Sequence, residues 1–329
     1  MQYSDIDKKD ILLQLKATES GAFFREERFQ GVIRVDGKDT LELLNRLSTA
    51  RVDNLKPGGV RETLLVNEKG RFIDAILVVP VDATTVRLVT SSPDVAAVLA
   101  WLEKYTIMED CVYSDESEDY AQYTEYNREV NDSDNALPVH DPGTVHGVWE
   151  EDDEILLRYE SVTGTDLRVL CSNEHADQTK EKLLNTHGLT YIGEEAFELW
   201  RIDRLLPAAG RELGAWSNPL EAGASAGIDF AKGCFIGQEV IARLENYEKV
   251  QRAPVQLLWD EGAPPEVEPG SRVQFEEQDA GLVTTHIFDP RIGKFRGIGL
   301  IRNAYQEAGT TLRYTIGNST YSLRTEHRL

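Results

Sequence analysis

The chain has 329 residues, of which 41% are hydrophobic, so it is long enough for two or three domains with packed cores. Its formal net charge of −22 repels phosphate backbones and anionic membranes, which excludes broad nucleic-acid binding. Its three cysteines lie far apart and match neither a disulfide framework nor a zinc pattern, so we predict no metal site.

The sequence shows no targeting or membrane segment. Residues 1–7 lack a basic region followed by an apolar run, so we predict no signal peptide. The most apolar segment, residues 72–81, contains Asp74 and Pro80 and is too short to span a bilayer. We therefore predict a soluble, cytoplasmic protein without a membrane partner.

Strand and helix patterns alternate along residues 1–207. Strand patterns occupy residues 31–35, 63–66, 71–79, 85–90, 155–159 and 166–171. Helical patterns occupy residues 1–28, 173–186 and 194–207. Another helix is predicted to begin at Asp39 or Thr40. A further helix is predicted after Ser91-Ser92-Pro93, with a serine as its N-cap and the proline in its first turn. This alternation indicates an α+β or α/β layer.

Three stretches have a distinctive composition. The acidic stretches 115–119 and 150–154 are predicted to be solvated loop faces, because the alternative, a metal loop, needs an alternating ligand spacing with a glycine turn that is absent. Residues 208–237 are rich in glycine, and a long glycine-bearing connection in a compact domain is usually functional or disordered. Its apolar content favours function.

The pattern changes after Arg252. A proline-rich stretch at residues 262–270 introduces short alternating segments at 272–276, 281–286, 297–302, 311–315 and 319–324. This spacing predicts a small β-barrel. We therefore predict an α+β body at residues 1–252 and a C-terminal β-barrel domain at residues 253–329.

Residues 232–239, which read K-G-C-F-I-G-Q-E, concentrate reactive side chains. The motif positions are Lys232, Gly233, Cys234, Gly237, Gln238 and Glu239. A helical pattern begins after Gly237, so Cys234 is expected at or just before a helix N-terminus, with Lys232 two residues away. Both features would lower the pKa of the thiol. The alternative is a small buried cysteine at a tight loop-to-helix joint.

The same eight residues resemble the K-G-C-[YF]-x-G-Q-E motif of the YgfZ family of folate-binding proteins, which is related to the T-protein (aminomethyltransferase) of the glycine cleavage system. Residues 67–71, 201–203 and 218–223 extend the resemblance over nearly the whole chain. The resemblance implies a T-protein-like α+β body with a small barrel. It also implies tetrahydrofolate, or a one-carbon derivative of it, as the cofactor.

The resemblance implies folate-binding residues as well. Asp203 stands where T-protein relatives have a glutamate that hydrogen-bonds the pterin, and a carboxylate can accept two parallel N–H bonds from an aminopyrimidine. The alternative for Asp203 is an ion pair with Arg204 or Arg201. Arg252 matches an arginine that contacts the glutamate tail of the folate. Phe197 is a candidate for stacking on the pterin, with plain helix core as its alternative.

One substitution separates two related functions. In T-proteins, by the same resemblance, the hairpin is followed by a G-[GR]-x-x-D-D motif whose second aspartate is catalytic. In this chain Ala75 occupies the position of that aspartate. The preceding residue, Asp74, should point to the opposite face of the strand. The presumed acid–base group is therefore absent, which argues against aminomethyl transfer. We predict Cys234 as the catalytic residue, acting as a nucleophile, a redox relay or a transient ligand for a labile metal cluster.

By resemblance, the predicted function is tetrahydrofolate binding that supports the assembly or repair of iron–sulfur enzymes. Its partners would be iron–sulfur client proteins, with an indirect link to tRNA modification and no direct nucleic-acid contact. One alternative is a folate-dependent aminomethyltransferase that has moved its acid elsewhere. Another is a chaperone or interaction module without folate chemistry. Whether the protein turns over a substrate is left open.

Overall fold

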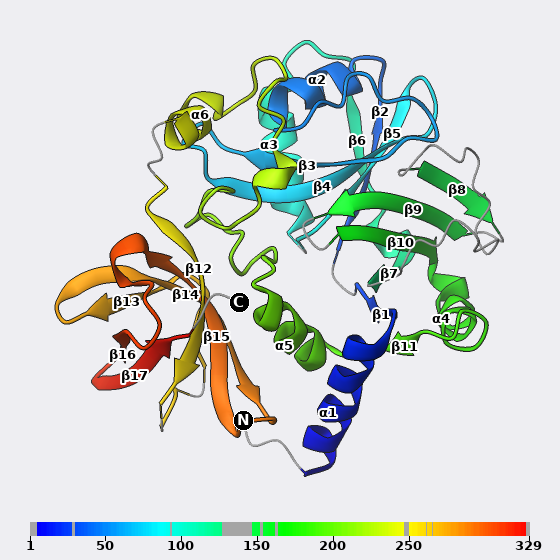
Figure 1. Cartoon of the computed structure of the whole chain (residues 1–329). Helices are drawn as coiled ribbons and strands as arrows, with labels where there is room; N and C mark the ends of the chain where they lie inside the picture. The colour runs from blue at the N-terminus through cyan, green and yellow to red at the C-terminus, as the bar shows by residue number, and fades with distance from the viewer. Residues whose placement is uncertain are drawn as a thin grey trace.

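The computed structural model describes residues 5–27, 30–92, 94–126, 147–151, 154–161, 164–246, 250–260, 262–264 and 266–326. Figure 1 shows an α+β body with two sheets, followed by a closed barrel at the C-terminus. This architecture confirms the predicted fold class. No helix in the described ranges combines the length and the apolar character needed to cross a bilayer.

The first sheet of the body has the strand order β3-β4-β5-β2-β6. Its strands are β2 (Val32–Asp36), β3 (Arg61–Val66), β4 (Phe72–Pro80), β5 (Thr85–Thr90) and β6 (Val112–Asp115). Helices α2 (Thr40–Leu47) and α3 (Val95–Tyr105) pack on one face, where Leu44 and Leu102 share a core with Ile76 and Val78. The predicted hairpin of β3 and β4 is confirmed.

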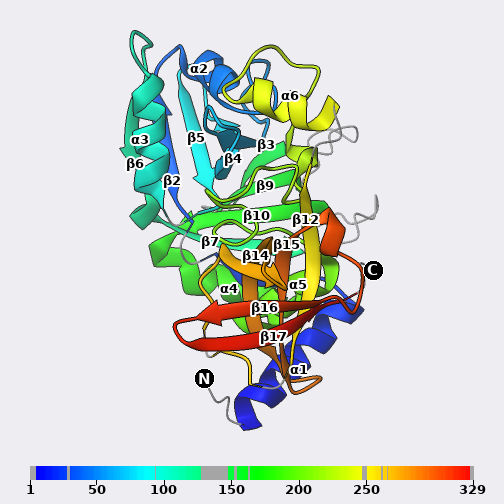
Figure 2. The ribbon, with the colours of Figure 1, turned by 90° about the vertical axis from the view of Figure 1, so that its left-hand side faces the viewer.

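The second sheet has the order β11-β1-β7-β10-β9-β8. Its strands are β1 (Phe23–Glu26), β7 (Tyr120–Tyr126), β8 (Gly147–Glu151), β9 (Glu154–Ser161), β10 (Gly164–Ser172) and β11 (Thr190–Tyr191). Leu77 and Val89 of the first sheet pack against Leu157 and Leu170 of the second. The two sheets therefore share one apolar layer, which is visible where β9 and β10 run below β3 and β4 in Figure 2.

Three further helices, α1 (Asp5–Ser20), α4 (Ala176–Asn185) and α5 (Glu194–Arg204), match predicted helical segments in part. Helices α4 and α5 begin and end within three residues of the predicted positions. The first helix ends at Ser20, and the predicted helix over residues 21–27 is wrong, because Phe23–Glu26 form β1. The cap of α3 differs from the prediction. Its cap is Asp94, whose carboxylate accepts a hydrogen bond from the Ala97 N–H at 3.0 Å, so the predicted serine cap is wrong. Pro93 lies outside the described residues.

The acidic stretch 150–154 is not wholly a solvated loop. Residues 152–153 lie outside the described residues, but Glu154 begins β9 and is 6% exposed. Its carboxylate accepts hydrogen bonds from Thr179 Oγ1 at 2.7 Å and Lys182 Nζ at 3.0 Å on α4. The prediction is therefore wrong for Glu154, because a sequence run of carboxylates does not show that a helix will supply partners for one of them.

The barrel closes in the order β12-β15-β14-β13-β16-β17. Its strands are β12 (Arg252–Trp259), β13 (Ser271–Phe275), β14 (Gln278–Asp289), β15 (Lys294–Arg302), β16 (Thr311–Ile316) and β17 (Ser319–Thr325). Buried Trp259, Val273 and Leu312 fill its interior. The barrel is confirmed, and the division into two domains at residue 253 stays a prediction.

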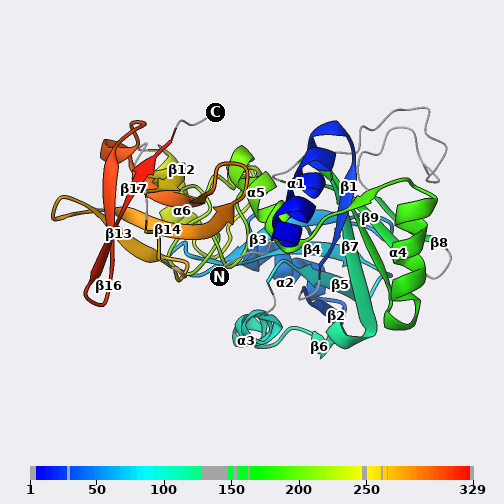
Figure 3. The same cartoon turned by 90° about the horizontal axis from the view of Figure 1, so that it is seen from below.

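Helix α5 joins the barrel to the body. Figure 3 shows α5 between the barrel and α1, and α5 contacts α1, β14 and β15. Arg201, which is 1% exposed, donates to Glu198 at 2.6 and 2.7 Å, to Glu212 at 2.6 Å and to Thr285 of β14 at 2.5 Å. Thr284 of β14 donates to the other oxygen of Glu212 at 2.6 Å. A buried charged network therefore links α5, the glycine-rich loop and the barrel.

Candidate functional site

A cavity of about 200 Å³ lies where the β3–β4 hairpin, β9 and the glycine-rich loop meet. Its lining residues are Ala50, Val60, Arg61, Glu62, Tyr159, Ala226, Ile228 and Asp229. These side chains come from four separate stretches of the sequence. The lining combines apolar side chains with a few charged ones, as small-molecule sites do. The cavity is therefore a candidate ligand site.

Glu62 is the most perturbed carboxylate of the cavity. Burial raises its pKa to about 7, nearby Asp166 adds to the rise, and the Arg168 guanidinium opposes it. Arg168 Nη2 also donates to the Tyr159 hydroxyl at 3.2 Å, and burial raises the pKa of that phenol. Glu62 can consequently gain or lose a proton near neutral pH.

Glu62 and Arg168 belong to no motif in the sequence, although their positions within strands give a weak signal. Arg168 stands between the apolar residues Leu167 and Val169 of β10, and Glu62 stands near the start of β3, whose last three residues are apolar. A charged side chain in such a position needs a partner from elsewhere in the fold. The partner can be identified only once the sheets have been brought together.

The hairpin places Ala75 and Asp74 on opposite faces of β4. Ala75 pairs with Leu64 and lies in an apolar cluster with Ile228. Asp74 is fully buried, and its Oδ1 accepts hydrogen bonds from Ser91 Oγ at 2.5 Å and from the Ala75 N–H at 2.8 Å. Burial raises the pKa of Asp74 to about 7, against the effect of these bonds. The position expected to carry an acid is thus filled by apolar packing.

Cys234 is exposed, while its neighbours Lys232 and Phe235 are 4% and 8% exposed. Helix α6 (Gln238–Asn246) begins only after Gly237, so the thiol is not at the helix N-terminus. The buried-joint alternative is also wrong, because the side chain meets solvent. The Cys234 side chain is therefore exposed to solvent, while Lys232 and Phe235 on either side of it are buried.

Lys232 makes no direct contribution to a thiolate. Its ammonium has three N–H donors, and they go to the carbonyl oxygens of Asn45, Ser48 and Ala50, each at 2.7 Å. Ser48 is the C-cap of α2, so the lysine caps the end of that helix. None of these three donors is left for a hydrogen bond to the Cys234 sulfur. Lys232 instead fixes the motif loop to α2 and, through Ala50, to the cavity wall.

Gly237 fixes the other end of the motif loop. Its φ is +80°, and a Cβ there would lie 2.6 Å from the Asn67 carbonyl oxygen and 3.0 Å from Val66 Cγ2. We expect Gly237→Ala to lower the free energy of unfolding by about 2 kcal/mol or more, because left-handed strain adds to this backbone clash. Denaturant unfolding measures the change.

Gly233→Ala is the matched control. A Cβ at Gly233 would meet no atom within 4 Å, so we expect a change within about 0.5 kcal/mol. Equal effects of the two substitutions would contradict the role of Gly237 as a backbone contact. The remaining motif residues, Gln238 and Glu239, lie in the first turn of α6.

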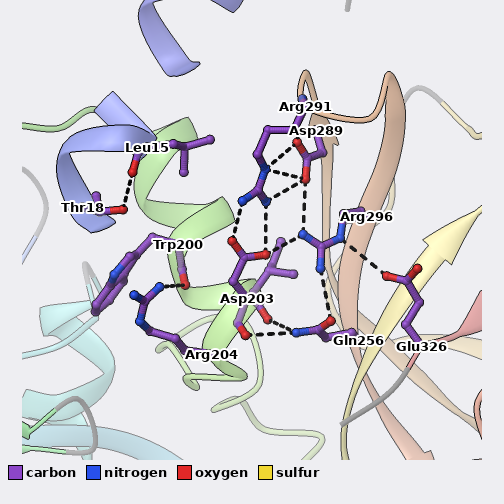
Figure 4. A network of polar contacts seen from close by, with 11 residues as sticks. Leu15, Thr18, Trp200, Asp203, Arg204, Gln256, Asp289, Arg291, Arg296 and Glu326 are labelled. Atoms are coloured by element: carbon purple, nitrogen blue, oxygen red, sulfur yellow. Dashed lines mark hydrogen bonds and ion pairs between the residues drawn. The ribbon is translucent and has the colours of Figure 1, made fainter. Parts of the chain in front are cut away.

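Asp203 lies at the joint between α5 and the barrel (Figure 4). Its carboxylate accepts hydrogen bonds from Arg291 and Arg296 at 2.6 Å each. Burial would raise the pKa of Asp203, but the bonds from these arginines outweigh burial and lower it. The ion pair with Arg201 or Arg204 that the sequence suggested as an alternative is therefore replaced by pairs to the barrel.

Arg252 and Phe197 also have partners within the protein. Arg252 donates to both carboxylate oxygens of Glu221, at 2.7 and 3.1 Å. The ring of Phe197 stacks on Trp200 at 5.5 Å between centroids, and the Arg25 guanidinium lies 4.1 Å above it. None of the three predicted folate contacts, Asp203 included, lines the cavity. Their folate roles stay predictions.

Comparison with known proteins gives consistent matches. Residues 7–124 match the family model described as the GCVT N-terminal domain. An aminomethyltransferase of Halalkalibacterium halodurans is 28% identical over 323 residues, covering 94% of this chain and 85% of the relative. An aminomethyltransferase of Caldanaerobacter subterraneus subsp. tengcongensis is 26% identical over 320 residues, also covering 94% and 85%.

A solved structure matches along most of the chain. The crystal structure of the glycine cleavage system aminomethyltransferase T from Bartonella henselae superimposes with a TM-score of 0.73 and 20% identity. The alignment covers 96% of this chain and 88% of that one. The fold of the chain is therefore that of the T-protein.

Proposed function

We propose that this chain, which has the T-protein fold and whose relatives support a T-protein-like family, binds tetrahydrofolate or a one-carbon derivative and acts in one-carbon chemistry. The cavity carries this proposal. It lies on the hairpin face that also presents Ala75, the position of the catalytic aspartate in T-proteins.

The cavity lining fits a reduced pterin. Val60 and Ile228 supply apolar contacts for a ring, and Glu62 supplies a carboxylate for N–H donors at its edge. Arg61 and Asp229 offer further polar groups at the same wall. The folate would supply the atoms that carry the one-carbon unit, while the protein binds and orients the ring.

Two activities are compatible with this site. Aminomethyl transfer is supported by the relatives, which are named aminomethyltransferases, and by Glu62, an acid on the same face as Ala75. Support of iron–sulfur enzymes, the activity implied by the YgfZ-like motif, is favoured by the outward position of Cys234. We favour the first, and formaldehyde release from an aminomethylated carrier would distinguish it from the second.

Calorimetric titration with tetrahydrofolate tests the proposed site. We expect Ala226→Trp to weaken binding at least about tenfold, because Ala226 is an exposed member of the cavity lining and the indole would occupy the ligand space. Cys234→Ala should keep binding, because the thiol lies outside the lining.

The control is Ala231→Trp on the same loop. Ala231 is exposed and is not part of the cavity lining, so its affinity should match the wild type. If wild-type protein bound no tetrahydrofolate, the folate proposal would fail. If both tryptophan variants bound as well as wild type, the ligand would have to lie elsewhere.

A further inference from the structure

Glu62 lies on the β3–β4 hairpin close to Ala75, the position at which T-proteins have their catalytic aspartate. In the hairpin register Leu64 pairs with Ala75, and Glu62 pairs with Leu77. Residues two apart on a strand share a face, and so do paired residues on adjacent strands. Glu62 therefore lies on the same face as Ala75, one pair further along the hairpin. That face meets the glycine-rich loop at the cavity.

The carboxylate of Glu62 is not used to hold the fold together. Glu62 is half-buried, and none of the described residues donates a hydrogen bond to its carboxylate. Asp229, the other carboxylate in the lining, accepts hydrogen bonds from the N–H groups of Ala231 and Lys232 at 2.9 and 3.1 Å. Asp203 is held by two barrel arginines. Of the two acids in the cavity lining, Glu62 is the one whose carboxylate accepts no hydrogen bond from the described residues.

We propose that Glu62 is the carboxylate that recognises the N–H edge of the bound ring and exchanges a proton with the solvent when the ring binds. A carboxylate accepts two parallel N–H bonds, which suits an aminopyrimidine edge. This inference rests on the proposed folate site. It also supplies the cavity with an acid–base group at neutral pH, which Ala75 cannot supply.

The inference predicts a pH dependence of binding. The charged and titratable groups that face Glu62 are Arg61, Tyr159, Asp166, Arg168 and Asp229. Burial and Asp166, opposed by Arg168, raise the pKa of Glu62 to about 7, so the ionised form that binds grows from a minority at pH 6 to a majority at pH 8. We expect the wild-type affinity for tetrahydrofolate to rise about tenfold over that interval.

Calorimetry in two buffers of different ionisation enthalpy tests the inference directly. At pH 7 the wild type should release about half a proton per tetrahydrofolate bound, because Glu62 is half protonated before binding. Glu62→Gln should lose this release and the pH slope, and should bind at least about tenfold more weakly at pH 8. Glu68→Gln, on the turn of the same hairpin and outside the lining, should behave like wild type.

Each outcome is decisive. Proton release and pH slope that persist in a folded Glu62→Gln variant overturn the inference and leave the folate site intact. If wild type binds no tetrahydrofolate, the proposed function and this inference fail together. Thermal unfolding checks that Glu62→Gln is folded. If it is not, the wild type alone decides: an affinity that is flat from pH 6 to pH 8, without proton release, overturns the inference.

Discussion

Replacing Lys232 by methionine is expected to lower the free energy of unfolding by about 3 kcal/mol or more. Burial lowers the pKa of Lys232 to about 8, so the side chain is mostly protonated at pH 7 and all three donors are available. The variant leaves the carbonyls of Asn45, Ser48 and Ala50 without this donor. Leaving a buried acceptor unpaired costs about 1–3 kcal/mol, and here three are affected at once.

Urea unfolding at pH 7 measures the effect, with Lys69→Met as the control. Lys69 is exposed on the hairpin turn, so its replacement should change the free energy of unfolding by less than about 0.5 kcal/mol. A Lys232→Met variant as stable as Lys69→Met would show that the ammonium does not hold the loop. We also expect Lys232→Met to alter the rate at which Cys234 is alkylated, because the loop that presents the thiol loses its anchor.

Arg201→Met is expected to cost about 3–5 kcal/mol of the free energy of unfolding. Glu198 and Glu212 would then be buried without their counter-charge, although the methionine fills part of the space. In the wild type, burial would raise the pKa of Glu198, but the charge and hydrogen bonds of Arg201, together with Arg211 and Arg25, outweigh burial and hold this pKa below the usual value. Without Arg201, burial is opposed only by the smaller effects of Arg211 and Arg25, so we expect the folded-state pKa of Glu198 to rise above that of the unfolded chain.

The sign of the pH effect follows from that reversal. The wild-type pair contributes stability above the unfolded pKa of Glu198 and loses it as the pH falls. In Arg201→Met, folding favours the protonated acid, so lowering the pH from 7 to 5 should recover stability relative to wild type. Arg204→Met, on the exposed end of the same helix, should cost less than about 1 kcal/mol. A pH-independent gap between wild type and Arg201→Met would contradict the buried-charge explanation.

Local patterns in the sequence predicted much of this fold. The hairpin, β2, β5, β9, β10 and five barrel strands carry the alternation or turn residues that indicate strands. The sequence patterns miss six of the described strands. Of these, β1, β6 and β11 have two to four residues, which is too few for a period to appear. The other three, β7, β8 and β12, have five to eight residues, and the prediction misses them although they are long enough to show a period. The short strands β1 and β6 form because longer neighbours, β7 and β2, offer an edge to pair with, and β11 then pairs with β1.

The site was harder to predict, because its contacts join distant parts of the chain. The motif at residues 232–239 is visible in the sequence, but Lys232 meets carbonyl groups more than 180 residues away. Glu62 acquires its raised pKa only where β3 approaches β10, and its place in a partly apolar strand does not identify Asp166 and Arg168 as the groups that act on it. Asp203 looked available for a ligand because its two arginine partners lie in the barrel.

The joint at α5 has a consequence for how the chain can be divided. Near the end of α5, Arg201 donates a hydrogen bond to Thr285 of the barrel. Two residues later, the Asp203 carboxylate accepts a hydrogen bond from Arg291 of the barrel. Gln256 of β12 also donates to the backbone carbonyls of Ile202 and Asp203. Cutting the chain before β12 would open these partners to water, so we expect the body and the barrel to unfold as one cooperative unit. Exchange of this barrel between homologues would therefore have to carry the end of α5 with it.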